Sequence, residues 1–220
     1  MSSPYQVTKD FEAALCAYTG AKYAVAVNSG TAALLLSVQW QIRDGRVVGE
    51  DGIVYKITVT NNVPVYAVVE IPRRTYVSVP CAILQAGARI AWRDEEWEGE
   101  YKLKPLPVWD SARRFTSGMY REGQFQCVSF AAAKILGAEQ GGAILHDNAE
   151  ADAWFRRMRF DGRTEGVDPL QDTFDLVGHH CIMIPSVAAT LLVRLHHLHK
   201  YNADLPHYEY PDLSKHPAFS

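Results

Sequence analysis

The chain has 220 residues, of which 48% are hydrophobic and 21% are charged, and its formal net charge is −3. This ordinary globular composition supports one large hydrophobic core or at most two small domains. Because no block of basic residues stands out, the composition argues against a protein that binds nucleic acid or a membrane surface.

The first elements read as helix, strand, turn and helix. Residues 8–18 have the pattern of an amphipathic helix that closes at Gly20. A short apolar strand over 23–27 leads into a polar turn at 28–31 and a second helix over 32–41 that is rich in Ala and Leu. A strand, a glycine-containing turn and a helix are typical of the opening of an α/β unit.

The segment 43–62 differs in character from its surroundings. Residues 53–60 are rich in β-branched side chains with partial alternation, and Gly and Asn turn signals flank them. We predict an inserted hairpin or strand pair here.

Strands and helices alternate over the rest of the chain. We expect strands at 65–71, 88–93, 106–109, 125–130 and 141–145, and helices at 77–86, 149–160 and 187–200. This order predicts a three-layer αβα domain over residues 1–200 with a mainly parallel sheet. Polar residues follow several strand ends, the edge at which such sheets bind ligands. Residues 201–220 hold three prolines with little periodicity, so we expect an extended C-terminal arm.

Three places in this order could carry chemistry. Ser29-Gly30-Thr31-Ala32 puts a glycine and two hydroxyls at a helix start, where free backbone N–H groups and the helix dipole favour an anion such as phosphate. An ordinary N-cap is the alternative interpretation of this turn.

Asp110 and Lys134 are the other two. Asp110 follows an apolar run and either caps the next turn or, if buried, pairs with a cation such as a protonated pyridine nitrogen. Lys134 lies among alanines shortly after a strand; it is either a solvated surface lysine or a partly desolvated amine that can attack an aldehyde.

Taken together and in order, several sequence blocks resemble the DegT/StrS-type family of pyridoxal-phosphate (PLP)-dependent sugar aminotransferases, which have the aspartate-aminotransferase-like fold. The blocks are 11–34, with Val-Asn-Ser-Gly-Thr-Ala-Ala-Leu at its end, 71–83 (Ile-Pro-Arg-Arg-Thr-Tyr-Val-Ser-Val-Pro-Cys-Ala-Ile), 109–113 (Trp-Asp-Ser-Ala-Arg) and 128–144, with Ser-Phe-Ala-Ala-Ala-Lys. The resemblance runs from about residue 11 to about residue 198. It implies the large PLP-binding domain of this fold.

The resemblance also assigns roles. Gly30, Thr31 and Ala32 would bind the cofactor phosphate with help from Ser129. Three further residues would serve the cofactor ring and the chemistry: Tyr76 would stack on the pyridine face, Asp110 would pair with the pyridinium nitrogen, and Lys134 would hold PLP as a Schiff base and move protons.

The sequence departs from the family pattern in several places. Arg113 stands near the cofactor's phenolic oxygen, where Gln or His is usual, and can donate there or bind an anionic substrate group. In 178–189, His180 and Ile182 replace the Asn and Arg of a segment that reaches the partner's site, so His180 is a substitute donor. We expect a shortened form without the usual small C-terminal domain, which covers the active site in the family. We also expect the 43–62 insertion to replace part of this cover.

The expected function is transfer of an amino group from an amino acid, by the family's habit glutamate, to a keto group on a nucleotide-linked sugar, in a homodimer with shared active sites. One rival is a catalytically reduced PLP-binding or partner-binding protein. Another is a PLP-dependent sugar dehydratase, against which Lys134 argues because dehydratases of the family replace this lysine.

Metal binding and secretion are both disfavoured. His196 and His199 have no carboxylate or Cys at helical spacing, so we expect no metal site. Four scattered cysteines indicate free thiols in a reducing compartment. With no leader-like N-terminus and no apolar run of bilayer length, the sequence predicts a cytoplasmic protein.

Overall fold

A five-stranded sheet forms the centre of the computed structural model, which describes residues 5–43, 46–48, 54–56, 59–60, 63–64, 67–206 and 208–219. Its order is β1 (Tyr23–Val27), β11 (Gly142–His146), β10 (Phe125–Ser129), β9 (Val108–Asp110) and β8 (Tyr101–Leu103). The pair β6 (Val68–Pro72) and β7 (Arg89–Arg93) continues beyond β8, where backbone hydrogen bonds join Glu70 to Lys104.

The sheet is mixed, so the expected mainly parallel sheet is wrong, while the layered α/β class is confirmed. β9 and β10 are parallel, as are β6 and β7. In contrast, β11 runs antiparallel to both β1 and β10, and β8 runs antiparallel to β9. The physical reason lies in the connections. Only residues 104–107 separate β8 from β9, and the 130–141 loop before β11 has no helix, whereas a parallel pair needs a long crossover.

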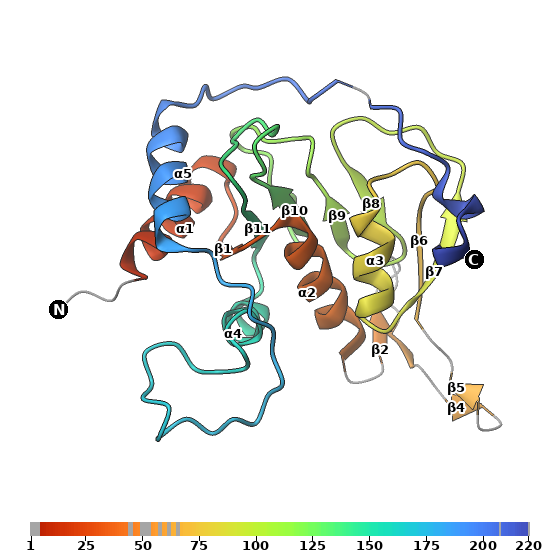
Figure 1. Ribbon diagram of the computed structural model, residues 1–220, viewed down its shortest axis with the longest axis horizontal. Coiled ribbons are helices and arrows are strands. Elements are labelled where there is room, and N and C mark those ends of the chain that lie inside the picture. The colour runs from red at the N-terminus through yellow and green to blue at the C-terminus, as the bar shows by residue number, and fades with distance from the viewer. Residues whose placement is uncertain are drawn as a thin grey trace.

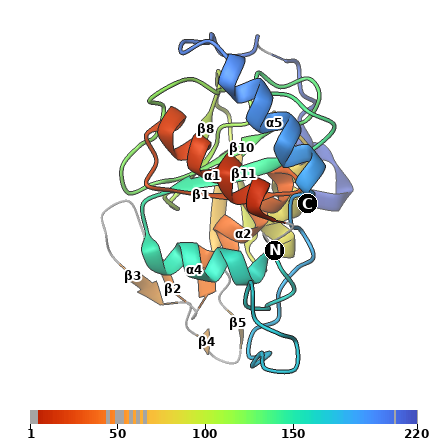
Figure 2. The ribbon, with the colours of Figure 1, turned by 90° about the vertical axis from the view of Figure 1, so that its left-hand side faces the viewer.

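Helices cover both faces of this sheet. α1 (Gln6–Thr19) and α5 (Pro185–His197) lie on one face, and α2 (Gly30–Ile42) and α3 (Ser78–Gln85) lie on the other, with α4 (Ala149–Met158) beside α2 (Figures 1 and 2). Alternate residues of a strand point to opposite faces. In β1, Val25 and Val27 therefore join the α2 core, while Ala24 and Ala26 join the core under α1 and α5. This confirms the predicted three-layer arrangement.

Two short strand pairs lie within or at the end of the predicted insertion, the second of them extending past residue 62. β2 (Arg46–Val48) pairs with β3 (Val54–Lys56), and β4 (Val59–Thr60) pairs with β5 (Val63–Pro64), both antiparallel. These short pairs are compatible with the predicted inserted hairpin or strand pair over 43–62, whose other residues after Arg43 lie outside the described residues. All four strands lie beyond the C-terminal end of α2 (Figure 1).

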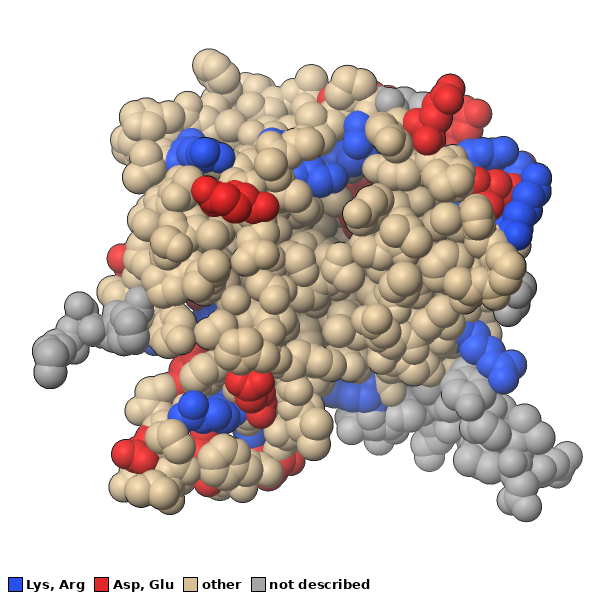
Figure 3. Space-filling view, viewed as in Figure 1, with Lys and Arg blue, Asp and Glu red and all other residues tan. Residues whose placement is uncertain are grey.

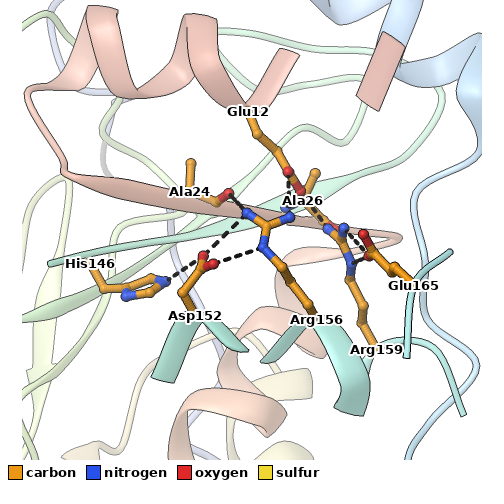
Figure 4. A network of polar contacts seen from close by, with 8 residues as sticks. All are labelled: Glu12, Ala24, Ala26, His146, Asp152, Arg156, Arg159 and Glu165. Atoms are coloured by element: carbon orange, nitrogen blue, oxygen red, sulfur yellow. Dashed lines mark hydrogen bonds and ion pairs between the residues drawn. The ribbon is translucent and has the colours of Figure 1, made fainter. Parts of the chain in front are cut away.

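A buried ion-pair network fastens α1 and α4 to β1 (Figure 4). The carboxylate of Glu12 in α1 accepts three hydrogen bonds: from Nη1 of Arg159 at 2.5 Å, from Nη1 of Arg156 at 2.8 Å and from the backbone N–H of Ala26 at 2.9 Å. Burial opposes ionisation of Glu12, but the two guanidiniums outweigh it and hold the pKa of its carboxyl below the ordinary value. A carboxylate oxygen of Glu165 forms an ion pair with Nη2 of Arg159 at 2.7 Å. Each charged group of this network therefore has an oppositely charged partner.

The segment after α5 crosses the top of the molecule to the outer side of β6 and β7 (Figure 1). It has no helix or strand over 201–206 or 208–211 and ends in two short 3₁₀ turns, Leu213–Lys215 and Pro217–Phe219. The sequence predicts an extended arm here; in the structure the segment lies against the body of the protein. None of the described helices has both the length and the apolar character that a membrane span requires.

Candidate active site

A cavity of about 480 Å³ opens where β9 and β10 end and α2 begins. This size suits a small-molecule site. Seven of the predicted site residues line it: Gly30, Thr31, Tyr76, Asp110, Arg113, Ser129 and Lys134. On the face drawn in Figure 3, the surface is hollowed below the 201–219 segment, with basic side chains at the edge of the hollow. The structure thus brings together residues that are far apart in the sequence.

The N-terminus of α2 forms one wall. Ser29 caps the helix in an extended conformation, and its Oγ accepts the N–H of Ala32 at 3.1 Å. The N–H groups of Gly30 and Thr31 belong to the first turn, which has no acceptor within the helix, and both residues line the cavity. Ala32 lies behind them, buried, with its N–H already used by the cap. This wall suits an anion.

Glycines allow this helix end to pack closely against the sheet. A Cβ on Gly30 would lie 2.9 Å from Cβ of Ser129, and one on Gly142 would lie 2.4 Å from the backbone carbon of Ser29. Both distances are shorter than real contacts allow. The position of the anion-binding turn next to Ser129 therefore depends on two glycines, and only Gly30 was predicted from the sequence.

Asp110 forms the floor and is 5% exposed at the end of β9. Its Oδ1 accepts the N–H of Ala112 and its Oδ2 accepts the hydroxyl of Tyr101, each at 3.0 Å. The oxygens of Tyr101 and Thr75 are 2.5 Å apart. Burial raises the pKa of Asp110, while the Ala112 N–H, the Tyr101 hydroxyl and the Lys134 charge oppose the rise. The carboxyl is thus fixed in orientation and favours a cationic partner.

Lys134 lies in the loop between β10 and β11. Lys134 belongs to a turn in which its backbone N–H donates to the carbonyl of Ala131 at 2.9 Å. A second hydrogen bond, from the N–H of Ala138 to the carbonyl of Phe130 at 2.8 Å, joins the two ends of this part of the loop. Burial lowers the pKa of the Lys134 amine, the Asp110 carboxylate opposes this, and the Arg113 guanidinium adds to it. A half-buried lysine with a lowered pKa has more neutral amine available for attack on an aldehyde.

Tyr76 and Arg113 lie at the mouth of the cavity. Tyr76, just ahead of α3, is 58% exposed, and its ring meets the edge of the Tyr210 ring at 6.4 Å between centroids. Arg113 donates from Nη2 to the carbonyl of Pro206. The residue expected at the cofactor's oxygen therefore also contacts the C-terminal segment.

His180 and Ile182 lie outside this cavity. The side chain of His180 is 73% exposed, and its Nδ1 is 2.9 Å from a carboxylate oxygen of Asp161. Ile182 bridges to Val27 and lines a different cavity. A contact of His180 with a partner's site stays a prediction.

Several lining residues were missed by the sequence analysis. They are Thr75, Trp97, Gln140, Tyr208 and Tyr210. The two tyrosines reach the cavity only because the C-terminal segment folds back over it, and no local pattern signals that path. The described strands of the 43–62 insertion lie at the opposite end of α2 (Figure 1), so they do not supply the cover expected of this insertion.

Several solved structures share the fold of this chain. AtS13 from Actinomadura melliaura aligns with a TM-score of 0.68 and 20% identity, over 87% of this chain and 60% of that one. Helicobacter pylori PseC, an aminotransferase involved in the biosynthesis of pseudoaminic acid, aligns with a TM-score of 0.65 and 17% identity, over 86% and 57%. The sugar aminotransferase CalS13 from Micromonospora echinospora aligns with a TM-score of 0.63 and 18% identity, over 87% and 61%.

The sequence itself matches the model of the DegT/DnrJ/EryC1/StrS aminotransferase family over residues 1–90 and 117–205. The chain belongs to this family. It spans about 57–61% of the length of the three solved structures described above. Among curated proteins there is no significant match.

The internal part that the family model leaves out, residues 91–116, contains β8, β9 and Asp110. The placement of Asp110 beside Lys134 is therefore a result of the structure. It supports the correspondence that the short motif Trp-Asp-Ser-Ala-Arg suggested.

Proposed function

We propose that the chain is a PLP-dependent aminotransferase that moves an amino group from an amino acid, glutamate by preference, to a keto group on a nucleotide-linked sugar, with Lys134 as its Schiff-base lysine. One observation carries this proposal. The N-terminus of α2, the buried carboxyl of Asp110 and the amine of Lys134 converge on a single cavity. Family membership supports the same conclusion.

The donor set fits the chemical groups of PLP. The N-terminus of α2 suits its phosphate, with Gly30, Thr31 and Ser129 as contacts. The buried Asp110 suits its pyridinium nitrogen, because a carboxyl with a raised pKa is stabilised as an anion by an adjacent cation. Tyr76 is the aromatic ring for its face. When bound, PLP supplies an electron sink for cleavage of bonds at an amine-bearing carbon.

The chain's own residues would handle the protons. Lys134 is half-buried and its amine has a lowered pKa, so it can take a proton from a substrate carbon and return it. Asp110 and Arg113 act on the pKa of this amine in opposite directions: the Asp110 carboxylate raises it and the Arg113 guanidinium lowers it. Arg113 is the donor we propose for the cofactor's phenolic oxygen.

The site of a second subunit is part of the proposal. We expect a homodimer in which His180 reaches the partner's cavity. The reason is that its side chain is exposed and does not line the cavity of its own chain. A second candidate function is PLP binding without amine transfer. The replacement of the family's Arg by Ile182, which lies away from the cavity, favours it.

Spectroscopy tests the proposal. Purified protein mixed with PLP should develop the visible absorbance of a lysine-bound cofactor, and glutamate should then bleach it. Lys134→Ala should abolish the visible band, whereas Lys22→Ala, at an exposed position, should leave it unchanged. No band, or a band that survives Lys134→Ala, would overturn the cofactor assignment.

Turnover separates the two candidate functions. A mixture with glutamate and a panel of nucleotide-linked keto-sugars should yield an amino sugar that mass spectrometry detects. Binding of PLP without bleaching by any amino acid and without product would establish the binding-only alternative.

A further inference from the structure

The C-terminal segment crosses the mouth of the cavity and is fastened on both sides of it; we call residues 200–206 and 208–213 the strap. On the first side, Arg114 donates to Asp204 from Nε at 2.9 Å and from Nη2 at 2.5 Å. Asp204 fits against Gly99, where a Cβ would lie 2.0 Å from its Oδ2. The N–H of Leu205 then donates to the carbonyl of Arg113 at 2.9 Å.

The second side is fastened to the end of the sheet. The N–H of Leu213 donates to the carbonyl of Arg73 at 2.9 Å, and the Leu213 side chain is buried. A carboxylate oxygen of Asp212 lies 3.6 Å from Nε of Arg73. Beyond the strap, the ring of Phe219 packs on Trp92 at 6.3 Å between centroids.

Between these two attachments, the described residues of the strap contact the body of the protein through side-chain interactions. Among the described residues 206 and 208–211, none makes a backbone–backbone hydrogen bond to the body of the protein. Pro206 and Pro211 bracket this stretch, and a proline has no N–H to donate. Tyr208 is 59% exposed. A stretch with few backbone hydrogen bonds and exposed side chains can lift at low cost while its ends stay fixed.

Tyr210 is the strap residue with contacts on both sides of the mouth. It lines the cavity together with Lys134, stacks on Trp97 at 6.0 Å with ring planes 13° apart, and meets Tyr76 edge-on. Burial raises the pKa of the Tyr210 phenol, and the nearby Arg113 guanidinium opposes this rise. Arg113 therefore lies next to Tyr210 and holds the strap directly through the carbonyl of Pro206.

We propose that the strap is the lid of the Lys134 cavity, with Tyr210 as its closing side chain and Arg113 as its latch. Ligands enter when the middle of the strap lifts between its two attachments. Because Arg113 lies close enough to Lys134 to influence its charge, release of the latch also changes the surroundings of the amine. The nature of the ligand rests on the proposed function, whereas the lid itself does not.

Chemical labelling of Lys134 without any cofactor tests the lid. Full-length protein is treated with trace acetic anhydride at neutral pH, and peptide mass spectrometry measures the acetylation rates of Lys134 and of the exposed Lys22. Tyr210→Ala removes the closing ring, and Asp212→Ala loosens the second attachment. Both should raise the rate at Lys134 roughly 3- to 10-fold relative to Lys22, because the cavity opens more often.

Two variants control the experiment. Tyr201→Ala removes an aromatic ring that is 86% exposed before the crossing, and it should leave the Lys134 rate unchanged. Tyr210→Phe keeps the ring that lines the cavity and removes only its hydroxyl, so it should give a smaller increase than Tyr210→Ala. Melting curves by circular dichroism confirm that each variant is folded.

The outcomes distinguish the lid from the proposed function. A Lys134 rate in Tyr210→Ala and Asp212→Ala equal to that of the natural chain overturns the lid, even if the protein binds PLP. A raised rate in a protein that never binds PLP supports the lid and overturns the cofactor assignment. A raised rate in Tyr201→Ala as well would show general loosening of the segment and would also overturn the lid.

Discussion

The hydroxyl of Tyr101 donates to Oδ2 of Asp110 at 3.0 Å, and both groups are buried between β8 and β9. Because these strands are antiparallel neighbours, Tyr101 stands directly opposite Asp110 in the sheet register. The sheet itself therefore orients the carboxyl that we assign to the cofactor.

Tyr101→Phe should weaken PLP binding while the fold survives. The substitution removes a hydrogen bond to a charged group, worth about 1.5–3 kcal/mol, and drives the pKa of Asp110 further up. Titration with PLP, followed by absorbance, should show an affinity lowered roughly 10- to 100-fold. Tyr201→Phe, at an exposed tyrosine, serves as the control. Equal affinities of the two variants would contradict the assigned role of Tyr101.

Asp110→Asn should abolish turnover without lowering the stability of the cofactor-free protein at pH 7. Burial raises the pKa of Asp110, so just above the ordinary carboxyl pKa of about 3.9 the native state retains a proton that the unfolded chain has lost. Stability contributed by this site therefore falls as the pH rises through that window, and the cost persists at neutral pH. Denaturant unfolding from pH 3 to 8 measures the effect. A large loss of stability in Asp110→Asn at pH 7 would contradict the prediction that the buried Asp110 carboxyl costs stability at neutral pH.

Glu12→Gln should destabilise the fold by about 3–5 kcal/mol at pH 7, because it leaves Arg156 and Arg159 without their shared buried anion. The native pKa of Glu12 is lowered, so its contribution is complete above the unfolded value of about 4.3 and is lost as the pH falls through the native value. Stability of the variant should therefore depend less on pH on the acid side. Urea unfolding measures this, with the exposed Glu139→Gln as control. Similar unfolding free energies for the two variants would refute the assignment.

Gly30→Ala should mainly lower the affinity for PLP, whereas Gly142→Ala should mainly lower the stability of the fold. The Cβ added at Gly30 meets the side chain of Ser129, which can shift, so we expect the helix end to move and PLP affinity to fall roughly tenfold. The Cβ added at Gly142 meets backbone atoms of Ser29 and Gly30, which cannot yield, so we expect a loss of about 3 kcal/mol in stability. Thermal melts and PLP titrations of both variants separate the two effects. A normal PLP affinity in Gly30→Ala would show that the turn is not a phosphate site.

The sequence by itself determined the layers and much of the site. The short apolar run of β1 and the Ser-Gly-Thr turn before α2 are local patterns. A local pattern encodes a strand, a helix start or a cap without reference to the rest of the chain. Gly30, Asp110 and Lys134 each follow or precede such an element, but their roles at a site were assigned only through the resemblance to the family. The expected order of strand ends then placed them at one edge of the sheet.

Only the tertiary structure decided the direction of β8, the partner of Asp110 and the cover of the cavity. β8 has three residues, too few for a periodicity, and its direction depends on the short connection to β9. Tyr210 reaches Trp97 and Tyr76 from more than 100 positions away in the sequence, through a strap whose course depends on ion pairs and packing at its two attachments. Such long-range contacts leave no periodic signal in the chain, because they are selected by the packing energy of the completed fold.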